Sequence, residues 1–231
     1  MKEIVKILDK HVMERGIDRH NSLEVLCDFL IDLFEVRHYS IACGWEKYMM
    51  EKCKEEPYLF CIAMIWMDKV ASAMEKGEWV DFFGELYEEM YQTRGKASAL
   101  GQFFTPGNLC DLLAKCTETG EGQRINDSAC GSGRTLLAHF AYSKFSRDGY
   151  YIGEDIDAMS VKMCALNMMI HGMRGRVVRH NTLVSPIHFD YGFEVNEIRH
   201  PFPSMYYSLR RIACKKDVKT NGSENVDKEC N

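Results

Sequence analysis

The pattern of hydrophobic and polar positions divides the chain into a helical first part and an alternating second part. From residue 1 to about residue 97, apolar side chains recur at steps of three and four, the spacing that places them on one face of an α-helix. The clearest example runs through Leu23, Leu26, Cys27, Leu30 and Phe34. We therefore predict a helical N-terminal domain over residues 1–97.

Three helices in this part have recognisable features. Asn21 followed by Glu24 is typical of a helix start, with Asn21 as the capping residue. Residues 58–74 form a nearly continuous apolar helix, which we expect to be buried on most sides. Residues 78–91 place an aromatic stripe opposite an acidic face. Since acidic side chains repel DNA, we interpret the aromatic stripe as core and not as a base-stacking surface.

Beyond residue 97 the pattern changes to short strands that alternate with helices. The predicted strands cover residues 124–129, 150–157 and 176–183, with a further short strand at 193–198, and the predicted helices cover 135–145 and 158–171. A further helix is expected to begin with Thr105 as cap and Pro106 at its first position. This alternation predicts an α/β domain over residues 98–205 with a parallel, doubly wound sheet. Residues 206–231 are polar, and we predict that they form a disordered tail.

Composition narrows the class of protein. The net charge of −5 does not favour nucleic-acid binding by the chain as a whole, although a local basic face can suffice. The ten cysteines are scattered without a Cys-x-x-Cys pair, so we expect neutral thiols in a reducing compartment and no metal site. The N-terminus does not resemble a signal peptide, and the longest apolar run, 58–67, is too short to span a bilayer. We expect a cytoplasmic protein with no membrane partner.

The ends of the predicted strands carry polar groups suited to one ligand. Strand one ends at Asp127 and is followed by the turn Gly131–Gly133, where glycine lets a ligand approach the backbone closely. Strand two ends near Asp155, where an acid can accept hydrogen bonds from both ribose hydroxyls, with Glu154 and Asp157 as alternatives. Strand three runs into Asn181, whose amide can pair with an adenine edge. These groups together predict an adenosine-containing ligand at the carboxyl edge of the sheet.

The residues of the turn discriminate among such ligands. A dinucleotide site has the pattern Gly-x-Gly-x-x-Gly, but the third glycine position is occupied by Leu136, and Asp127 would repel a phosphate. No Gly-x-x-x-x-Gly-Lys sequence occurs, so a P-loop is excluded. An acidic turn suits a ligand with a positive amino group and a sulfonium, and S-adenosylmethionine is that ligand.

Four stretches in order carry a more specific signal: residues 101–106, residues 127–133, residues 153–157 continuing to 166–172, and residues 180–183. The first reads Gly-Gln-Phe-Phe-Thr-Pro, and the second reads Asp-Ser-Ala-Cys-Gly-Ser-Gly. Together they resemble the N6-adenine-specific DNA methyltransferase family, in particular the modification subunits of type I restriction systems. The first stretch matches the family's Gly-Gln-Phe/Tyr-Phe-Thr-Pro, and the second is similar to its Asp-Pro-Ala-Cys-Gly-Ser-Gly, with Ser128 in place of proline. The other two look like the family's second strand and helix and its third block. The likeness covers about residues 80–185. It implies a Rossmann-like S-adenosylmethionine-dependent methyltransferase core with a short, incomplete parallel sheet.

The resemblance also implies roles for individual residues. The block from Gln102 to Pro106 would lie over the methionine end of S-adenosylmethionine, and Asp155 would hold the ribose. The implied cofactor-binding set is Gln102, Phe103, Phe104, Thr105, Pro106, Asp127, Ala129, Gly131, Ser132, Gly133, Asp155, Ile156 and Asn181. Within this set Thr105 would bind the carboxylate of the methionine, Ile156 would pack on the adenine, and Asn181 would read its edge.

The chain departs from the family at the catalytic block. The family has Asn/Asp-Pro-Pro-Tyr/Phe, whose oxygens accept bonds from the flipped adenine and whose ring stacks on it. No Asn-Pro-Pro-Phe occurs in the sequence, and the nearest candidates by position are His200, Pro201 and Phe202. Three interpretations stay open: a binder of S-adenosylmethionine whose catalysis is lost or partner-dependent, an active adenine methyltransferase with an unusual block, and a non-enzymatic interaction module.

The resemblance implies partners as well. DNA is the implied substrate, and a specificity subunit, another methylase subunit or a second copy of the chain is the implied protein partner. Arg199, Arg210, Arg211, Lys215 and Lys216 could contact phosphate, although an ordinary solvated tail is the more economical interpretation.

Overall fold

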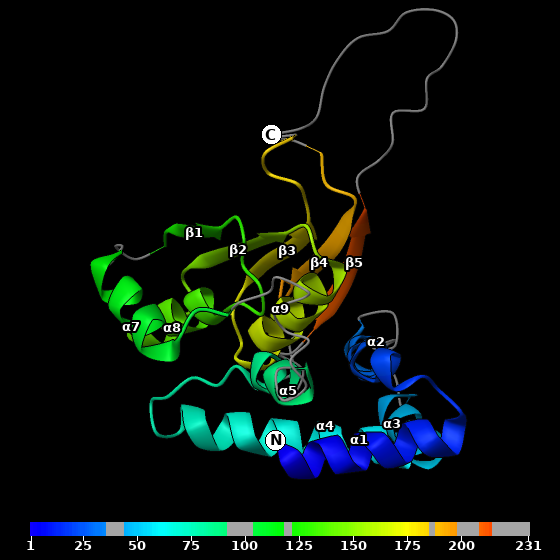
Figure 1. Ribbon diagram of the computed structural model, residues 1–231. Helices are drawn as coiled ribbons and strands as arrows, with labels where there is room; N and C mark the ends of the chain where they lie inside the picture. The colour runs from blue at the N-terminus through cyan, green and yellow to red at the C-terminus, as the bar shows by residue number, and fades with distance from the viewer. Residues whose placement is uncertain (36–43, 92–103, 118–121, 185–187, 198–207, 214–231) are drawn as a thin grey trace, which may run out of the picture.

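The structure is a computed structural model that describes residues 1–35, 44–91, 104–117, 122–184, 188–197 and 208–213 (Figure 1). The first part contains α1 (Lys2–Arg15), the 3-10 turn η1 (Arg19–Asn21), α2 (Ser22–Phe34), α3 (Gly44–Glu55), α4 (Pro57–Met74) and α5 (Phe82–Tyr91). The second part contains α7 (Gly107–Cys116), β1 (Arg124–Asp127), α8 (Arg134–Tyr142), β2 (Tyr150–Asp155), α9 (Ala158–Ile170), β3 (Gly175–Arg179), β4 (Tyr191–Val195) and β5 (Leu209–Ala213). The predicted α/β class with a helical N-terminal region is confirmed.

The sheet has five strands in the order β1-β2-β3-β4-β5. The first three strands are parallel, as predicted, but β4 pairs with β3 and β5 pairs with β4 in antiparallel fashion. A parallel connection requires a crossover, usually through a helix, and the described part of the segment 180–190 contains none. The prediction of an all-parallel sheet is therefore wrong for its last two strands.

The described helices of the second part cover one face of the sheet. Tyr151, Val177 and Phe193 point to this face and are at most 2% exposed, and Figure 1 shows α7, α8 and α9 on the same side of the strands. Successive right-handed crossovers that move in one direction across a sheet place their helices on one side. The row Ile152, Arg176 and Glu194 points to the opposite face and is only half-buried. The expected doubly wound arrangement is thus wrong for the described elements.

The helical region shares its core with the sheet. Trp66 of α4 packs against Phe82 and Phe83 of α5, with ring centroids 6.4 and 5.2 Å away. Helix α5 contacts both α1 and α9, and α2 also packs on α9, so the helical layer lies directly on a helix of the α/β part (Figure 1). One continuous hydrophobic cluster therefore joins the two parts.

Two predicted helix starts differ in detail. Asn21 precedes α2 but makes no side-chain capping bond; Asp18 instead accepts a hydrogen bond from the backbone N–H of His20 and starts η1. Helix α7 begins at Gly107 after Pro106, and Thr105 does not cap it.

The helix predicted from residue 78 starts later. It begins at Phe82, because the Asp81 carboxylate accepts a hydrogen bond from the backbone N–H of Gly84 at 2.8 Å and ends the preceding non-helical segment.

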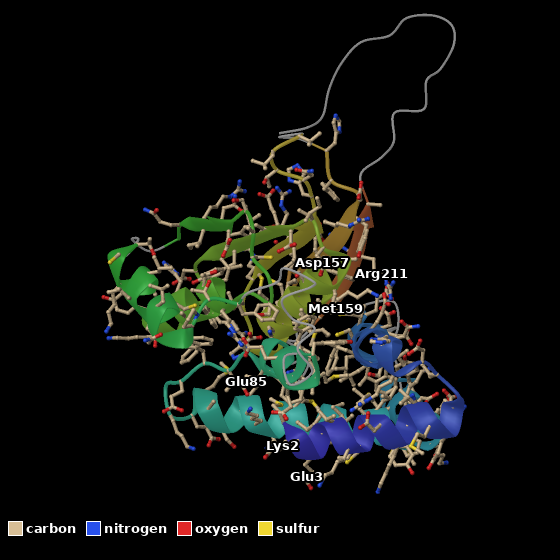
Figure 2. The ribbon with its side chains drawn as sticks, in the orientation of Figure 1. Lys2, Glu3, Glu85, Asp157, Met159 and Arg211 are labelled. Carbon is tan, nitrogen blue, oxygen red and sulfur yellow. The ribbon has the colours of Figure 1, made fainter. Side chains whose placement is uncertain are left out.

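The predicted polar tail contains a strand. Residues 209–213 form β5, contrary to the prediction of disorder from residue 206. Nε of Arg211, which Figure 2 labels, lies 3.3 Å from a carboxylate oxygen of Glu35 at the end of α2, and Arg210 pairs with Glu194. Both arginines are thus held by carboxylates, which weakens the case for phosphate contacts at these positions. Residues 198–207, with the candidates His200, Pro201 and Phe202, and residues 214–231 lie outside the described residues.

Candidate cofactor site

The glycine turn connects the end of β1 to the start of α8 and requires glycine at two positions. Gly131 and Gly133 have φ angles of 53° and 92°, in the left-handed region that other residues rarely adopt. A Cβ atom on Gly133 would lie 2.9 Å from the Sγ atom of Cys164 in α9. The backbone N–H of Cys130 donates to the carbonyl of Glu154 at 3.0 Å, so the turn is tied to the end of β2.

Asp155 is the acid that faces this turn. Its Oδ2 atom accepts a hydrogen bond from the N–H of Gly131 at 2.9 Å, and its Oδ1 atom accepts one from the N–H of Asp157 at 2.8 Å. A carboxylate oxygen can accept more than one hydrogen bond, so both oxygens retain capacity for ribose hydroxyls.

The two alternative acids are engaged elsewhere. Glu154 contacts Asn126 Nδ2 at 3.3 Å and His180 Nδ1 at 3.1 Å. Asp157 caps α9 by accepting the N–H of Ser160 at 2.7 Å. Of the three acids, Asp155 is therefore the one whose carboxylate contacts the glycine turn.

Asp127 shapes the start of the turn. One carboxylate oxygen accepts the N–H of Ala129 at 3.1 Å, and the other accepts the hydroxyl of Thr135. A hollow of about 360 Å³ lies between α7, β1 and the first turn of α8, and Asp127, Ser128 and Thr135 are among its lining residues. Asp127 thus places a negative group beside an open space next to the turn.

The described end of the Gln102–Pro106 block packs directly on the turn. The ring of Phe104 lies 3.4 Å from the position that a Cβ atom on Gly131 would take, and it makes an edge contact with Tyr87 at 5.5 Å between centroids. The carbonyl of Thr105 lies 3.4 Å from Nη1 of Arg134. The structure therefore brings Phe104 and Thr105 to the turn, while Gln102 and Phe103 lie outside the described residues.

The residues predicted to contact adenine lie at the surface. Ile156 is 60% exposed, directly after β2, and Asn181 is exposed after β3, where its Oδ1 accepts the N–H of Leu183 at 3.2 Å. A hydrogen bond from the N–H of His180 to the carbonyl of Asp155, at 2.8 Å, joins the two strand ends. An apolar side chain and an amide thus lie on the two strand ends that meet at Asp155.

A buried polar network behind the turn was not identified from the sequence. Ser132 is 0% exposed, and its hydroxyl donates to Asp81 at 2.6 Å, so its side chain faces the protein interior and only its backbone is available to a ligand. Asp81 is also bound by Arg134 and Asn167. The one local signal was an acid three residues before Gly84 at a helix start.

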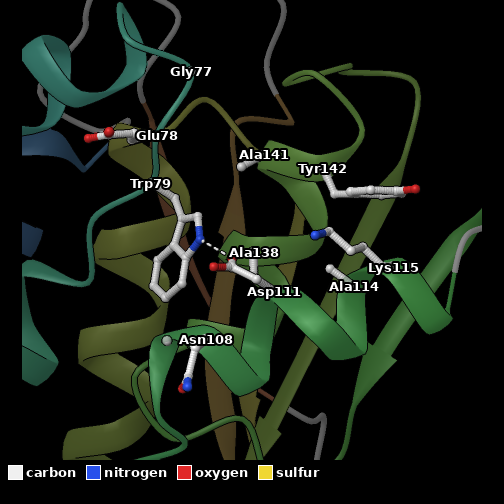
Figure 3. Close-up of a pocket in the computed structure, with 11 residues that line it drawn as sticks. Gly77, Glu78, Trp79, Asn108, Asp111, Ala114, Lys115, Ala138, Ala141 and Tyr142 are labelled. Atoms are coloured by element: carbon white, nitrogen blue, oxygen red, sulfur yellow. Dashed lines mark hydrogen bonds between the residues drawn. The ribbon is translucent and has the colours of Figure 1, made fainter.

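Away from the glycine turn, the described residues offer neither a metal site nor a second group of the predicted cofactor residues. No group of three or more potential metal ligands occurs among them, and no described helix is long and apolar enough to cross a membrane. Burial raises the pKa of Cys110 to about 11, so this thiol is neutral. A hollow of about 540 Å³ opens beside Trp79, whose indole donates to Asp111 at 2.9 Å (Figure 3), but none of the predicted cofactor residues lines it.

Comparison with known protein sequences relates the chain to DNA methylases. A sequence model described as N-6 DNA Methylase matches residues 78–226. The chain is 30% identical over 117 residues to the type I restriction enzyme EcoEI methylase subunit of Escherichia coli, covering 46% of this chain and 24% of that protein. It is 36% identical over 104 residues to the MpnII methylase subunit of Mycoplasma pneumoniae, covering 41% of this chain and 18% of that one. The chain thus matches a quarter or less of the length of these curated relatives.

Solved structures give a weaker likeness. The methyltransferase subunit of a type I restriction-modification system from Streptococcus thermophilus aligns with a TM-score of 0.40 at 17% identity, covering 82% of this chain and 62% of that one. A modification subunit of a putative type I restriction enzyme from Vibrio vulnificus aligns with a TM-score of 0.37 at 20% identity, covering 47% and 26%.

Proposed function

Because the chain belongs to the N-6 DNA methylase family, we propose that it binds S-adenosylmethionine at the carboxyl ends of β1 and β2. The observation that carries the proposal is the position of the Asp155 carboxylate, which is hydrogen-bonded to Gly131 of the turn. In this arrangement Asp155 accepts the ribose hydroxyls, Ile156 contacts the adenine, and Asn181 pairs with its edge. Phe104 and Asp127 lie on the side of the turn where the methionine portion is expected.

The charges around the turn support this ligand over a dinucleotide. Asp127 and Asp155 flank the turn directly, and Asp81 and Glu88 surround the first residue of α8, Arg134. The turn and the start of α8 thus carry four carboxylates and a single guanidinium, so a pyrophosphate at the start of α8 would be repelled. The positive amino and sulfonium groups of S-adenosylmethionine are attracted instead.

We further propose that DNA adenine is the methyl acceptor of the family to which the chain belongs, and that catalysis by this chain is either lost or dependent on a partner subunit. The relatives are methylase subunits of type I restriction enzymes, which supports a DNA substrate and assembly with other subunits. The dependence on a partner rests on the missing Asn-Pro-Pro-Phe block. The bound cofactor supplies an electrophilic methyl group, and this chain supplies the residues that hold and orient it.

Two measurements separate this function from its alternatives. We expect titration calorimetry to detect binding of S-adenosylmethionine and none of NAD. Absence of S-adenosylmethionine binding at millimolar concentration would instead support a non-enzymatic module.

Transfer of a tritiated methyl group to mixed-sequence DNA tests the dependence on a partner. We expect the isolated chain to transfer no methyl group above background. Robust transfer that survives both His200→Ala and Phe202→Ala would contradict partner dependence and also exclude these two residues as the catalytic block.

A further inference from the structure

Asp81 is a buried carboxylate that belongs to the helical region and lies behind the glycine turn. It is 2% exposed and directly precedes α5. Its Oδ1 atom caps that helix by accepting the N–H of Gly84 at 2.8 Å. A Cβ atom on Gly84 would lie 1.8 Å from Oδ2 of Asp81, so the glycine is what lets the carboxylate fold back over the helix start.

The carboxylate of Asp81 binds three elements of the α/β part at once. It accepts hydrogen bonds from the hydroxyl of Ser132 in the turn at 2.6 Å, from Nε of Arg134 at 2.5 Å and from Nδ2 of Asn167 in α9 at 2.7 Å. Nδ2 of Asn167 also lies 3.0 Å from the carbonyl of Ser132. The side chain and the backbone carbonyl of Ser132 are therefore both fixed, which sets the peptide planes between Gly131 and Gly133.

Arg134 extends this network to the other wall of the site. Its Nη atoms lie 2.9 and 3.1 Å from the two carboxylate oxygens of Glu88 in α5. The guanidinium also lies 5.1 Å from the centroid of Phe104, the ring that packs on Gly131. One cation, oriented by two acids of the helical region, thus touches both the turn and the Phe104 block.

The energetics favour a positioning role for this network over a purely stabilising one. Removing a carboxylate and a guanidinium from water is costly, and a buried ion pair seldom adds net stability over an apolar replacement. Burial raises the pKa of Asp81, while Arg134 and the hydrogen bonds from Ser132 and Gly84 act in the opposite direction. A serine or asparagine at position 81 could cap α5 without the cost of burying a charge. Neither residue would hold both Ser132 and Arg134 as the carboxylate does.

We propose that Asp81 is a positioning residue for the cofactor site, which holds the glycine turn and Arg134 in the binding geometry from the helical region. This inference rests on the proposed binding of S-adenosylmethionine. The affinity of the site for S-adenosylmethionine then depends in part on the position of α5 relative to the glycine turn.

The first test is the dissociation constant for S-adenosylmethionine, measured by calorimetry on the full chain. We expect Asp81→Asn to weaken binding at least tenfold and Ser132→Ala to weaken it about threefold. The double variant should bind no more weakly than Asp81→Asn alone, because both substitutions act on the same contact between Ser132 and residue 81. Val70→Ala, in the buried core of α4, is the control: it lowers stability and should leave the affinity within twofold of the wild type.

The second test is hydrogen–deuterium exchange of the ligand-free chain over residues 127–137. Asp81→Asn should accelerate exchange there, whereas Val70→Ala should accelerate it in α4. If Asp81→Asn does not fold, both measurements are made on Ser132→Ala and Arg134→Lys instead. We expect affinity to fall about threefold in Ser132→Ala and about tenfold in Arg134→Lys.

The results distinguish this inference from the proposed function. The positioning role alone would be overturned if the wild type binds S-adenosylmethionine and Asp81→Asn shows unchanged affinity and unchanged exchange. If Asp81→Asn does not fold, the same result in both Ser132→Ala and Arg134→Lys would overturn it. A wild-type chain that binds no S-adenosylmethionine would overturn the proposed function.

Discussion

The two ends of the proposed cofactor site are built in different ways. At the glycine turn, buried contacts from α5, α8 and α9 meet at Ser132 and fix the backbone. At the adenine end, Ile156 is 60% exposed and Asn181 hydrogen-bonds within its own loop. We therefore expect a change at the turn to alter both folding and ligand affinity, whereas a change at the adenine end should alter ligand affinity alone.

The largest expected effect is the loss of stability on substituting Gly133. Gly133→Val places a branched side chain at a φ of 92° and within reach of Cys164. Backbone strain of about 1–3 kcal/mol and overpacking of about 1–3 kcal/mol predict a loss of about 4 kcal/mol in the free energy of unfolding.

The matched control for this change is Gly16→Val at the end of α1. Gly16 has a φ of 64° and no atom within 4 Å of the added Cβ position, so only the strain remains. Denaturant unfolding of both variants measures the difference, and equal losses would show that close packing against Cys164 does not constrain the turn.

The next effect is a dependence of stability on pH that originates beside Asp81. His171 is 1% exposed. Its Nε2 accepts the N–H of Val80 at 3.3 Å, which leaves the proton on Nδ1 to donate to the carbonyl of Asn167 at 2.7 Å. Burial lowers the pKa of His171 from 6.5 to about 4.

Between these two pH values the unfolded chain binds a proton that the folded chain does not. The free energy of unfolding should therefore fall as the pH drops from 6.5 to 4, by about 3 kcal/mol from this group. His171→Gln should remove most of this slope, while His20→Gln at an exposed position should keep it. Urea unfolding at several pH values gives the answer, and an unchanged slope in His171→Gln would refute the assignment.

A smaller effect concerns the acid that joins the two ends. Asp155→Ala removes a charged acceptor of ribose hydroxyls, and hydrogen bonds to charged groups contribute about 2 kcal/mol. We expect about a thirtyfold loss of affinity for S-adenosylmethionine by calorimetry. Asp148→Ala, at an exposed acid just before β2, should bind like the wild type. Equal affinity of the two variants would remove Asp155 from the site.

The smallest effect is expected at the adenine end. Asn181→Ala removes one neutral amide contact of about 1 kcal/mol, which corresponds to about a fivefold loss of affinity with no change in stability. Leu183→Ala, in the same loop and 95% exposed, is the control. A loss of stability in Asn181→Ala would show that this end is also braced by the fold, and the contrast between the two ends would fail.

The sequence was sufficient for the elements around the candidate site that depend on local patterns. Strand ends, the glycine turn and Asp155 follow from hydrophobic periodicity and from residue types that occur together. The network around Asp81 could not be found in this way, because Asp81 lies 51 positions from Ser132 and 86 from Asn167. An isolated acid on an otherwise ordinary helix start gives no sign of such distant partners.

The sheet shows the same limit. The parallel strands were predicted from their alternation with helices, but the direction of β4 depends on how the chain returns after β3. β5 was missed because Arg210 and Arg211 resemble a polar tail until Glu194 and Glu35 are placed opposite them. Pairings between distant residues, rather than local patterns, determined both features.

A crystal structure of the chain with bound S-adenosylmethionine would test the proposed cofactor site most directly. We predict that both ribose hydroxyls lie within hydrogen-bonding distance of Asp155 and that the methionine portion lies between the Gly131–Gly133 turn and Phe104. Ligand found instead in the hollow beside Trp79, or a ribose that does not contact Asp155, would contradict the proposed position of the cofactor.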